Sequence, residues 1–163
     1  MANEMMPESP DGLRLLALFS KNRPEWCIGE QACFMHRGTT VPLYDTLGAE
    51  VLTYCLNQTE LATVVCARTE TAKLYEVAAN CAHLKFVVQM EDCTADDKER
   101  AAAAGVELLS FADVRTAGRA KPCAMSAPAA DTVATFCYTS GTYCVVLLVV
   151  MLLIRYCVRY CCV

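Results

Sequence analysis

The first long apolar stretch of the chain reads Leu13-Arg14-Leu15-Leu16-Ala17-Leu18-Phe19, and Arg14 is its only charged residue. A half-buried strand would alternate apolar and polar residues, whereas this run is apolar at nearly every position. Uninterrupted runs of this length are typical of strands in parallel sheets, where helices cover both faces. Residues 13–19 therefore predict a fully buried strand of an α/β protein.

Short β-prone runs and amphipathic helical stretches alternate along the rest of the chain. Strands are predicted at residues 13–19, 39–44, 62–67, 86–90, 106–111 and 132–138. Helices are predicted from Pro24 to a stop at Gly38, and at residues 49–58, 69–82 and 94–104, and residues 116–131 are expected to form a loop. Pro42 has no N–H to donate, which favours an edge position for its strand. The alternation predicts a mostly parallel sheet with flanking helices.

The charge of the chain argues against a nucleic-acid partner. Its 163 residues carry 14 lysines and arginines against 18 aspartates and glutamates, a net charge of −4 at pH 7. No stretch gathers basic side chains as recognition of a phosphodiester backbone requires. A chain of this length has room for one folding unit with its own core. We therefore expect one domain and no binding of nucleic acid.

Cysteine is abundant, with 12 residues in the chain. In a small secreted protein this number would indicate disulfides, but the start of the chain lacks the basic and apolar segments of a signal peptide. We therefore expect a reducing, cytoplasmic compartment and thiols that act as small buried apolar groups. No Cys-x-x-Cys pair occurs, and His36 and His83 lie far apart in the sequence, so no metal site is expected.

The polar residues at the two ends of the first predicted helix have plain structural interpretations. Asn22 is expected to cap this helix, with Pro24 in its first turn and Trp26 anchoring it to the sheet. Lys21 and Arg23 could contact an acidic ligand, although a solvated helix start is the simpler interpretation. His36 is expected to provide a favourable charge at the helix C-terminus and not to act as a catalytic base.

A hydroxyl-rich loop follows the last predicted strand and reads Tyr138-Thr139-Ser140-Gly141-Thr142. Backbone N–H groups and hydroxyls in such a loop can converge on a phosphate, and glycine permits a close approach. By itself the pattern is more typical of a turn whose hydroxyls bond to their own backbone. The loop is a candidate phosphate site that needs support from elsewhere in the chain.

Three separated segments provide that support, because in sequence and order they resemble the N-terminal region of long-chain fatty acyl-CoA synthetases, members of the adenylate-forming ligase superfamily. They read Phe19-Ser20-Lys21-Asn22-Arg23-Pro24-Glu25-Trp26, Glu30-Gln31-Ala32-Cys33-Phe34 and Val41-Pro42-Leu43-Tyr44-Asp45-Thr46-Leu47-Gly48. The resemblance covers residues 13–142. It implies a two-step reaction in which a fatty acid attacks the α-phosphate of ATP and coenzyme A then takes the acyl group.

The resemblance implies cofactors and site residues as well. ATP, Mg and CoA are the family's cofactors, and fatty acid, ATP and CoA its partners. Thr139, Ser140, Gly141 and Thr142 match the loop that contacts the phosphates of ATP. The family continues this loop with Thr-Gly, a variable residue and Pro-Lys-Gly, whereas this chain continues with Tyr143 and Cys144 and has no Pro-Lys-Gly. A cation that would offset the triphosphate and a glycine that would let the backbone wrap it are therefore missing.

The chain is accordingly expected to be a truncated N-terminal fragment that is inactive alone and binds no cofactor productively. It divides into a polar extension at residues 1–12, a partial ligase domain at 13–142 and a divergent apolar, cysteine-rich tail at 143–163. Adenine-, ribose- and Mg-binding segments and the lysine-bearing lid of the family have no counterpart in the sequence. No residue is expected to be catalytic.

Two alternatives remain open at this point. The uncharged stretch before Arg155 is shorter than the roughly 20 residues of a spanning helix, but Cys157, Cys161 and Cys162 beside arginines could mimic a palmitoylated anchor. The chain would then be a non-catalytic interaction or membrane-tethered fragment with weak membrane association through its tail. The other alternative is a relic that does not fold, because missing strands would leave unpaired edges.

Overall fold

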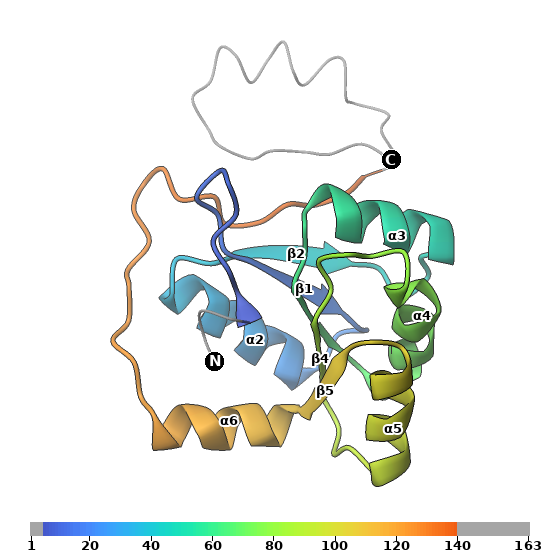
Figure 1. Ribbon diagram of the computed structural model, residues 1–163. Coiled ribbons are helices and arrows are strands. Elements are labelled where there is room, and N and C mark those ends of the chain that lie inside the picture. Colours follow the sequence, from blue (N-terminus) through green and yellow to red (C-terminus); the bar gives the residue numbers. More distant parts are fainter. Residues whose placement is uncertain (1–4, 140–163) are drawn as a thin grey trace.

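The computed structural model describes residues 5–139, which form a five-stranded sheet. Helices flank this sheet (Figure 1). The strands are β1 (Leu15–Phe19), β2 (Thr39–Leu43), β3 (Thr63–Cys66), β4 (Phe86–Gln89) and β5 (Glu107–Ser110). The helices are α2 (Pro24–Met35), α3 (Ala49–Gln58), α4 (Arg68–Ala78), α5 (Ala95–Ala103) and α6 (Phe111–Ala120). The predicted α/β class with a parallel sheet is confirmed.

All four strand pairs are parallel, and the order across the sheet is β2-β1-β3-β4-β5. The connection after β1 leads to β2 on one side of β1, and the connection after β2 returns past β1 and places β3 on its other side. The direction in which strands are added therefore reverses between β1 and β3. In open α/β sheets such a switch point, at the carboxyl ends of the strands, is where ligands bind.

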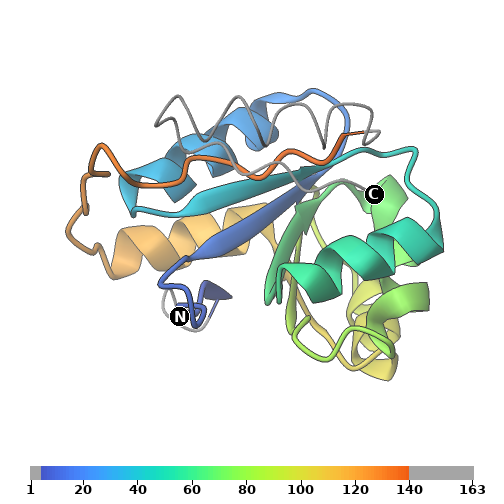
Figure 2. The same ribbon diagram turned by 90° about the horizontal axis from the view of Figure 1, so that it is seen from above.

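Side chains of β1 alternate between the two faces of the sheet and explain why its sequence is apolar throughout. Ala17 and Phe19 join a large core with α3, α4 and Ala101 of α5. Leu16 and Leu18 join a smaller core with Trp26 and other residues of α2 and α6. Figure 2 shows these two groups of helices on opposite sides of the sheet. The predicted burial of this strand on both faces is confirmed.

The first helix begins at Pro24, as predicted, and ends earlier than expected. Its N-cap is Arg23, which has an extended backbone, and no side chain caps it, so the proposed cap at Asn22 is wrong. Pro24 occupies the first turn as predicted. Helix α2 stops at Met35, and the left-handed residue after it is Arg37, with φ 54°. Close packing requires glycine at position 38, because a Cβ atom there would clash with the sulfur of Cys33.

Helix α5 has the two ends that its sequence predicts. The Thr94 hydroxyl accepts from the Asp97 N–H at 3.2 Å, and the Asp97 carboxylate accepts from the Thr94 N–H at 2.9 Å, which forms a capping box. Gly105 takes φ 79° after the helix, and the Val106 N–H donates to the Ala101 carbonyl at 3.1 Å. These two features form a Schellman motif, in which glycine readily adopts the left-handed conformation that ends the helix.

Helix α6 is the main departure from the predicted elements. Residue Phe111 was expected to end a strand and residues 116–131 to form a loop, whereas the strand stops at Ser110 and Phe111–Ala120 is helical. The Ser110 hydroxyl accepts from the Asp113 N–H at 3.0 Å and caps the new helix. A serine followed three residues later by an acidic residue is a helix-start signal that the periodicity alone did not reveal.

The predicted strand at residues 132–138 is also wrong as stated. The segment is extended and lies beside β2, but it pairs with that strand through a single isolated parallel bridge between Thr40 and Thr135. Figures 1 and 2 show it following the outer side of β2. We call residues 132–139 the edge segment.

Candidate functional site

The edge segment carries the start of the candidate phosphate loop to the carboxyl edge of the sheet. The Thr40 N–H donates to the Ala134 carbonyl at 3.0 Å, and the Phe136 N–H donates to the Thr40 carbonyl at 2.8 Å. The Thr39 hydroxyl adds a bond to the Val133 carbonyl at 2.6 Å. Because the pairing is parallel, the chain leaves this edge in the direction in which β2 ends.

Pro42 explains why the edge segment does not become a full strand. The Thr39 N–H points toward β1, where it donates to the Arg14 carbonyl at 2.7 Å, whereas the Thr40 N–H points outward to the edge segment. Two residues on, Pro42 faces outward as well and has no N–H to continue the ladder. The pairing of β2 with β1 is unaffected, so the proline is tolerated at this position in β2.

Two aromatic side chains hold the end of the edge segment against the large core. Phe136 and Tyr138 are buried, and both belong to the core cluster that contains α3. The Tyr138 hydroxyl donates to the side-chain oxygen of Gln58 at the end of α3, at 2.8 Å. Thr139 follows and is exposed. An anchor made of two buried aromatic rings therefore directly precedes the candidate loop.

Thr139 is the one residue of the candidate phosphate loop that lies within the described part of the chain. Ser140, Gly141 and Thr142 lie outside the described residues, as does the tail at 143–163. Among residues 5–139, the loop thus contributes one exposed hydroxyl at the carboxyl edge. This hydroxyl fits a phosphate contact chemically, but the assignment of the four residues to ATP stays a prediction.

A hollow of about 340 Å3 opens at the carboxyl ends of β1 and β2. Its lining comes from two of the three segments that resemble acyl-CoA synthetases, and it consists of Ser20, Lys21, Asn22, Trp26, Pro42, Leu43, Tyr44 and Asp45. The Lys21 ammonium is highly exposed and lies 3.8 Å from the Asp45 carboxylate. The Lys73 ammonium donates to the Asp45 carbonyl from the other side. These two lysines provide positive charge beside the hollow.

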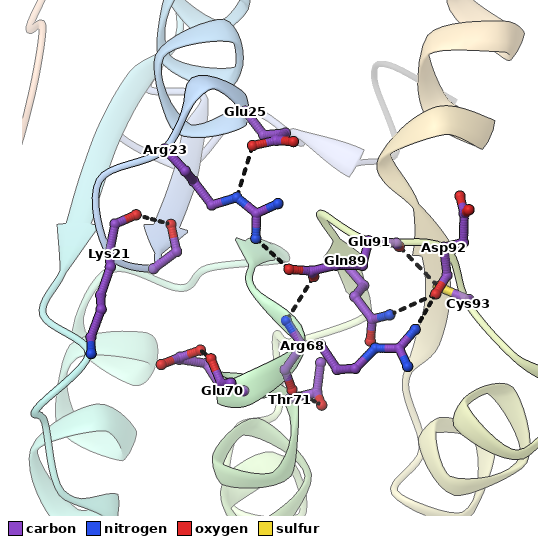
Figure 3. A network of polar contacts seen from close by, with 12 residues as sticks. Lys21, Arg23, Glu25, Arg68, Glu70, Thr71, Gln89, Glu91, Asp92 and Cys93 are labelled. Carbon is purple, nitrogen blue, oxygen red and sulfur yellow. Dashed lines mark hydrogen bonds and ion pairs between the residues drawn. The ribbon is translucent and has the colours of Figure 1, made fainter.

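An ion-pair network occupies the switch point between β1, β3 and β4 (Figure 3). The Arg23 guanidinium lies between two carboxylates, donating to Glu25 at 2.8 Å and to Glu91. The second oxygen of Glu91 accepts from the backbone N–H of Arg68 at the start of α4, at 2.9 Å. The Arg68 side chain donates to the Asp92 carbonyl. The network therefore joins the beginnings of α2 and α4 to the loop after β4.

Protonation of the network follows from these bonds. Burial by itself would raise the pKa of Glu91, but hydrogen bonds from Arg23 and from the Arg68 N–H outweigh it and hold the pKa below its usual range. The bond from Arg23 also lowers the pKa of Glu25, and both carboxylates raise the pKa of Arg23. All three groups are charged near neutral pH. Arg23 thus contacts carboxylates of its own chain, which corrects the expectation of a solvated helix start.

A buried amide lies under this network at the end of β4. Gln89 is fully buried, and its side-chain nitrogen donates to the Asp92 carbonyl at 3.1 Å. Its side-chain oxygen has no hydrogen-bond partner among the described residues. Sequence reasoning did not identify Glu91 or Arg68, because their partners are distant along the chain, and it did not identify Gln89, whose partner Asp92 lies three residues away.

Metal ligands do not gather in the described part of the chain. Residues 5–139 contain no group of three or more His, Cys, Asp or Glu side chains placed to hold an ion. No helix formed by these residues is both long and apolar enough to cross a bilayer.

Comparison with known proteins identifies the family of the chain. Residues 12–143 match the model of the AMP-binding enzymes. The chain belongs to this family. Long-chain-fatty-acid–CoA ligase 1 of Cavia porcellus is 39% identical over 137 residues, and the Homo sapiens ligase 1 is 40% identical over the same length. Each match covers 82% of this chain and 19% of the relative, so this AMP-binding chain spans about a fifth of the length of these relatives.

Solved structures show the same fold for this AMP-binding chain. The A domain of a carboxylic acid reductase from Segniliparus rugosus, in complex with AMP and a carboxylic acid, aligns with a TM-score of 0.69 at 19% identity. That alignment covers 86% of this chain and 25% of the reductase chain. An anthranilate CoA ligase in complex with anthranoyl-AMP aligns with a TM-score of 0.63 over 80% of this chain. The resemblance to adenylate-forming ligases is thereby confirmed at the level of family and fold.

Proposed function

We propose that residues 13–142 form the first part of a domain that activates fatty acids with ATP. In this reaction the carboxylate oxygen of the fatty acid bonds to the α-phosphorus of ATP and pyrophosphate leaves. The sulfur of coenzyme A then attacks the acyl carbon, and AMP leaves from the acyl-adenylate. The observation that supports the proposal is the parallel pairing of the edge segment with β2, because it directs Thr139 to the carboxyl edge of the sheet.

The proposal gives the residues of this chain distinct roles. Thr139, Ser140, Gly141 and Thr142 contact the phosphates of ATP through hydroxyls and backbone N–H groups. Lys21 supplies positive charge at the rim of the hollow that lies along the same edge. The Arg23–Glu91 network holds the loops that border the switch point and does not bind the nucleotide, because its guanidinium is already paired with two carboxylates.

The polypeptide of residues 1–163 is expected to have no acyl-CoA synthetase activity by itself. Tyr143 and Cys144 replace the Thr-Gly of the family loop, and no Pro-Lys-Gly follows in residues 143–163. The lysine cation and the flexible glycine that would hold a triphosphate are therefore missing from this sequence. Mg, ATP and CoA are accordingly not bound productively by this polypeptide.

The direct test measures acyl-CoA and AMP formation by purified residues 1–163 with ATP, palmitate, coenzyme A and magnesium. We expect no product above a no-enzyme control. Turnover above that background would show that the polypeptide is an active synthetase and would overturn the expectation of inactivity.

A pair of chimaeras tests the proposed role of the matched segment. The first replaces the matched part of the Cavia porcellus ligase with residues 13–142 of this chain and keeps the relative's own continuation. The second also replaces the next 21 positions with residues 143–163. We expect the first to form acyl-CoA and the second to be inactive. A first chimaera that unfolds cooperatively yet lacks activity would contradict the proposal.

A membrane-tethered, non-catalytic role of the tail at 143–163 is the competing hypothesis. Flotation with liposomes distinguishes this hypothesis from the proposed synthetase segment, because a tether requires that residues 1–163 float with the liposomes and that residues 1–142 do not. Equal recovery of both polypeptides in the aqueous fraction would exclude the tether.

A further inference from the structure

The outward face of α2 carries no charged side chain. On its inner face Gly29 and Cys33 are buried, and a Cβ atom on Gly29 would lie 3.3 Å from Leu18 of β1, so this face lies close to the sheet. An α-helix turns by about 100° per residue, which places the exposed residues on the opposite side. We call these exposed residues the α2 stripe, and they are Pro24, Cys27, Ile28, Gln31, Ala32 and Met35.

This composition differs from that of the other helices. The exposed side of a surface helix usually carries charged and polar residues. The two charged residues of α2, Glu25 and Glu30, are half-buried, and Glu25 accepts from Arg23. Each of the other described helices exposes at least one charged side chain, namely Glu50 of α3, Glu76 of α4, Glu99 of α5 and Arg119 of α6. The α2 stripe therefore has the composition of a packing face.

The loop after α6 enlarges the apolar surface at the end of the stripe. The Ser126 N–H donates to the Met35 carbonyl at 3.0 Å, and a parallel bridge pairs Ser126 with His36. These bonds hold Met125 beside Met35. The exposed fractions of Ile28, Met35 and Met125 are 47%, 50% and 71%. Large apolar side chains thus follow one line on the surface that the described residues leave uncovered.

We propose that residues 145–154 of this chain pack along the α2 stripe, beginning at its Pro24 end. This apolar segment reads Val-Val-Leu-Leu-Val-Val-Met-Leu-Leu-Ile. Its exposure to water is unfavourable, yet it has only about half the length of a helix that spans a bilayer. The stripe has a matching length, because Pro24 and Met35 are about 17 Å apart along the helix axis and ten residues are at least about 15 Å long.

The described part of the chain ends where this packing begins. Thr139 lies at the carboxyl edge beside β2, and α2 begins at the same edge, since only residues 20–23 separate it from β1. Trp26 and Pro42 line the same hollow there, which places the start of α2 beside β2. Residues 140–144 can span about 16 Å, which exceeds three strand spacings of about 4.8 Å. The connection is therefore long enough.

The occupant comes from the same chain for two reasons. A short linker gives a tethered segment an effective concentration on the order of mM, whereas a second molecule must be present at that concentration to compete. Neither surface carries a charge that would have to be buried, because the stripe and residues 145–154 are both uncharged. Arg155 and Arg159 follow the segment, so they fall beyond the stripe.

Cys27 reports this packing in the full 163-residue chain, because it lies on the stripe. The test measures its reaction with N-ethylmaleimide at pH 7 by peptide mass spectrometry, in the unchanged chain and in the double variant Leu148→Asp/Val149→Asp. Burial of two carboxylates is unfavourable, so the variant segment should leave the stripe and Cys27 should react at least about fivefold faster.

Cys93 is the internal control, because it packs against the large core on the opposite face of the sheet and should react equally in both chains. An unchanged rate at Cys27 would overturn the proposal. An equal rise at Cys93 would also count against it, because the effect would then not be confined to the stripe.

The native cysteines test the direction of packing without any substitution. Cys123 marks the Met35 end, since its sulfur lies 3.9 Å from Nε2 of His36, the C-cap of α2. Oxidation of the dilute full chain with copper-phenanthroline, followed by peptide mapping, should link Cys144 to Cys27 and Cys157 to Cys123 within one molecule. A link between Cys144 and Cys123 in place of these would overturn the proposed placement.

Two further measurements on the unchanged chain decide between occupants. Light scattering should find a monomer, and flotation with phosphatidylcholine–phosphatidylserine liposomes should leave the chain in the aqueous fraction. A dimer with links only between chains would show that a second copy covers the stripe. Flotation that is lost in the variant Ile28→Asp would show that the stripe faces a membrane. Either result would overturn the proposal.

Discussion

Two regions beside the same sheet are held in different ways. At the switch point, side chains from the starts of α2 and α4 and the end of β4 meet in the Arg23–Glu91 network, above strands that are paired on both sides. At the outer side of β2, the edge segment is attached by two backbone bonds at Thr40, by threonine hydroxyls and by two buried aromatic rings.

The difference shows where this domain concentrates its stability. Elements with few bonds open locally at a lower free energy than the strands at the centre of a core. The edge segment precedes the candidate phosphate loop, so the part proposed to contact the nucleotide is attached to the sheet by its weakest pairing. The following four changes test this contrast.

The largest effect is expected from Phe19→Ala in β1, a strand that is paired on both sides. Phe19 is fully buried, and truncation should lower the free energy of unfolding by about 3–5 kcal/mol. Phe136→Ala is the matched control, because Phe136 is also buried but lies in the edge segment. It should cost less, since the segment can detach without unfolding the sheet. Urea unfolding followed by circular dichroism measures both, and equal losses would refute the contrast.

The next effect is expected from Glu91→Gln at the switch point. The amide keeps the shape of the side chain but removes the charge that pairs with Arg23, and we expect a loss of about 1–2 kcal/mol after allowance for solvent screening. The control is Glu99→Gln on α5, where the carboxylate is exposed. A loss at Glu91 no larger than that at Glu99 would show that the network does not stabilise the fold.

The same pair has a defined pH dependence. The pKa values of Glu91 and Glu25 are lower in the folded chain than usual, so the unfolded chain binds more protons at acidic pH. Their stabilisation is complete above the unfolded pKa of about 4.3 and is lost as the pH falls through the folded pKa values. Urea midpoints should therefore drop below about pH 4.3, less steeply for Glu91→Gln than for the unchanged chain.

A smaller effect is expected from Thr39→Val, which keeps the shape of a fully buried side chain and removes its hydroxyl bond to Val133. The Val133 carbonyl loses one partner, and the cost should be about 1 kcal/mol. The loss should fall on the edge segment, so limited proteolysis should cleave after residue 131 faster while the exchange of β1 amides stays unchanged. Faster exchange throughout the sheet would contradict a local effect.

The smallest effect is expected from Pro42→Val, which should strengthen the weaker region. The new N–H faces outward and can donate to the edge segment, but loss of the proline raises the entropy of the unfolded chain. The net change in stability should be within about 0.5 kcal/mol of zero. Hydrogen exchange is the sensitive measurement, and the Phe136 amide should exchange more slowly. No change in that amide would argue against the role given to Pro42.

Most helices and strands could be predicted because their signals are local. The apolar run of β1, the capping box of α5 and the stop at Gly105 each depend on residues within one turn or strand. Helix α6 also has local signals, in the cap pair Ser110 and Asp113 and in the spacing of the apolar Phe111 and Val114, but the apolar run of residues 106–111 favours a strand that continues through Phe111. Residues 132–138 have a strand-like sequence, yet Pro42 in another strand limits their pairing.

The sequence by itself determined the α/β alternation, the family resemblance and the residues of the candidate phosphate loop through Thr142, because these depend on neighbours along the chain. Only the tertiary structure decided that Arg23 meets Glu91, that Cys123 meets His36, and that the edge segment lies on β2 and not elsewhere. Strand order and register bring these residues together, and both are set by how helices pack on the two faces of the sheet. Distant partners of this kind leave no periodic signal in a single sequence.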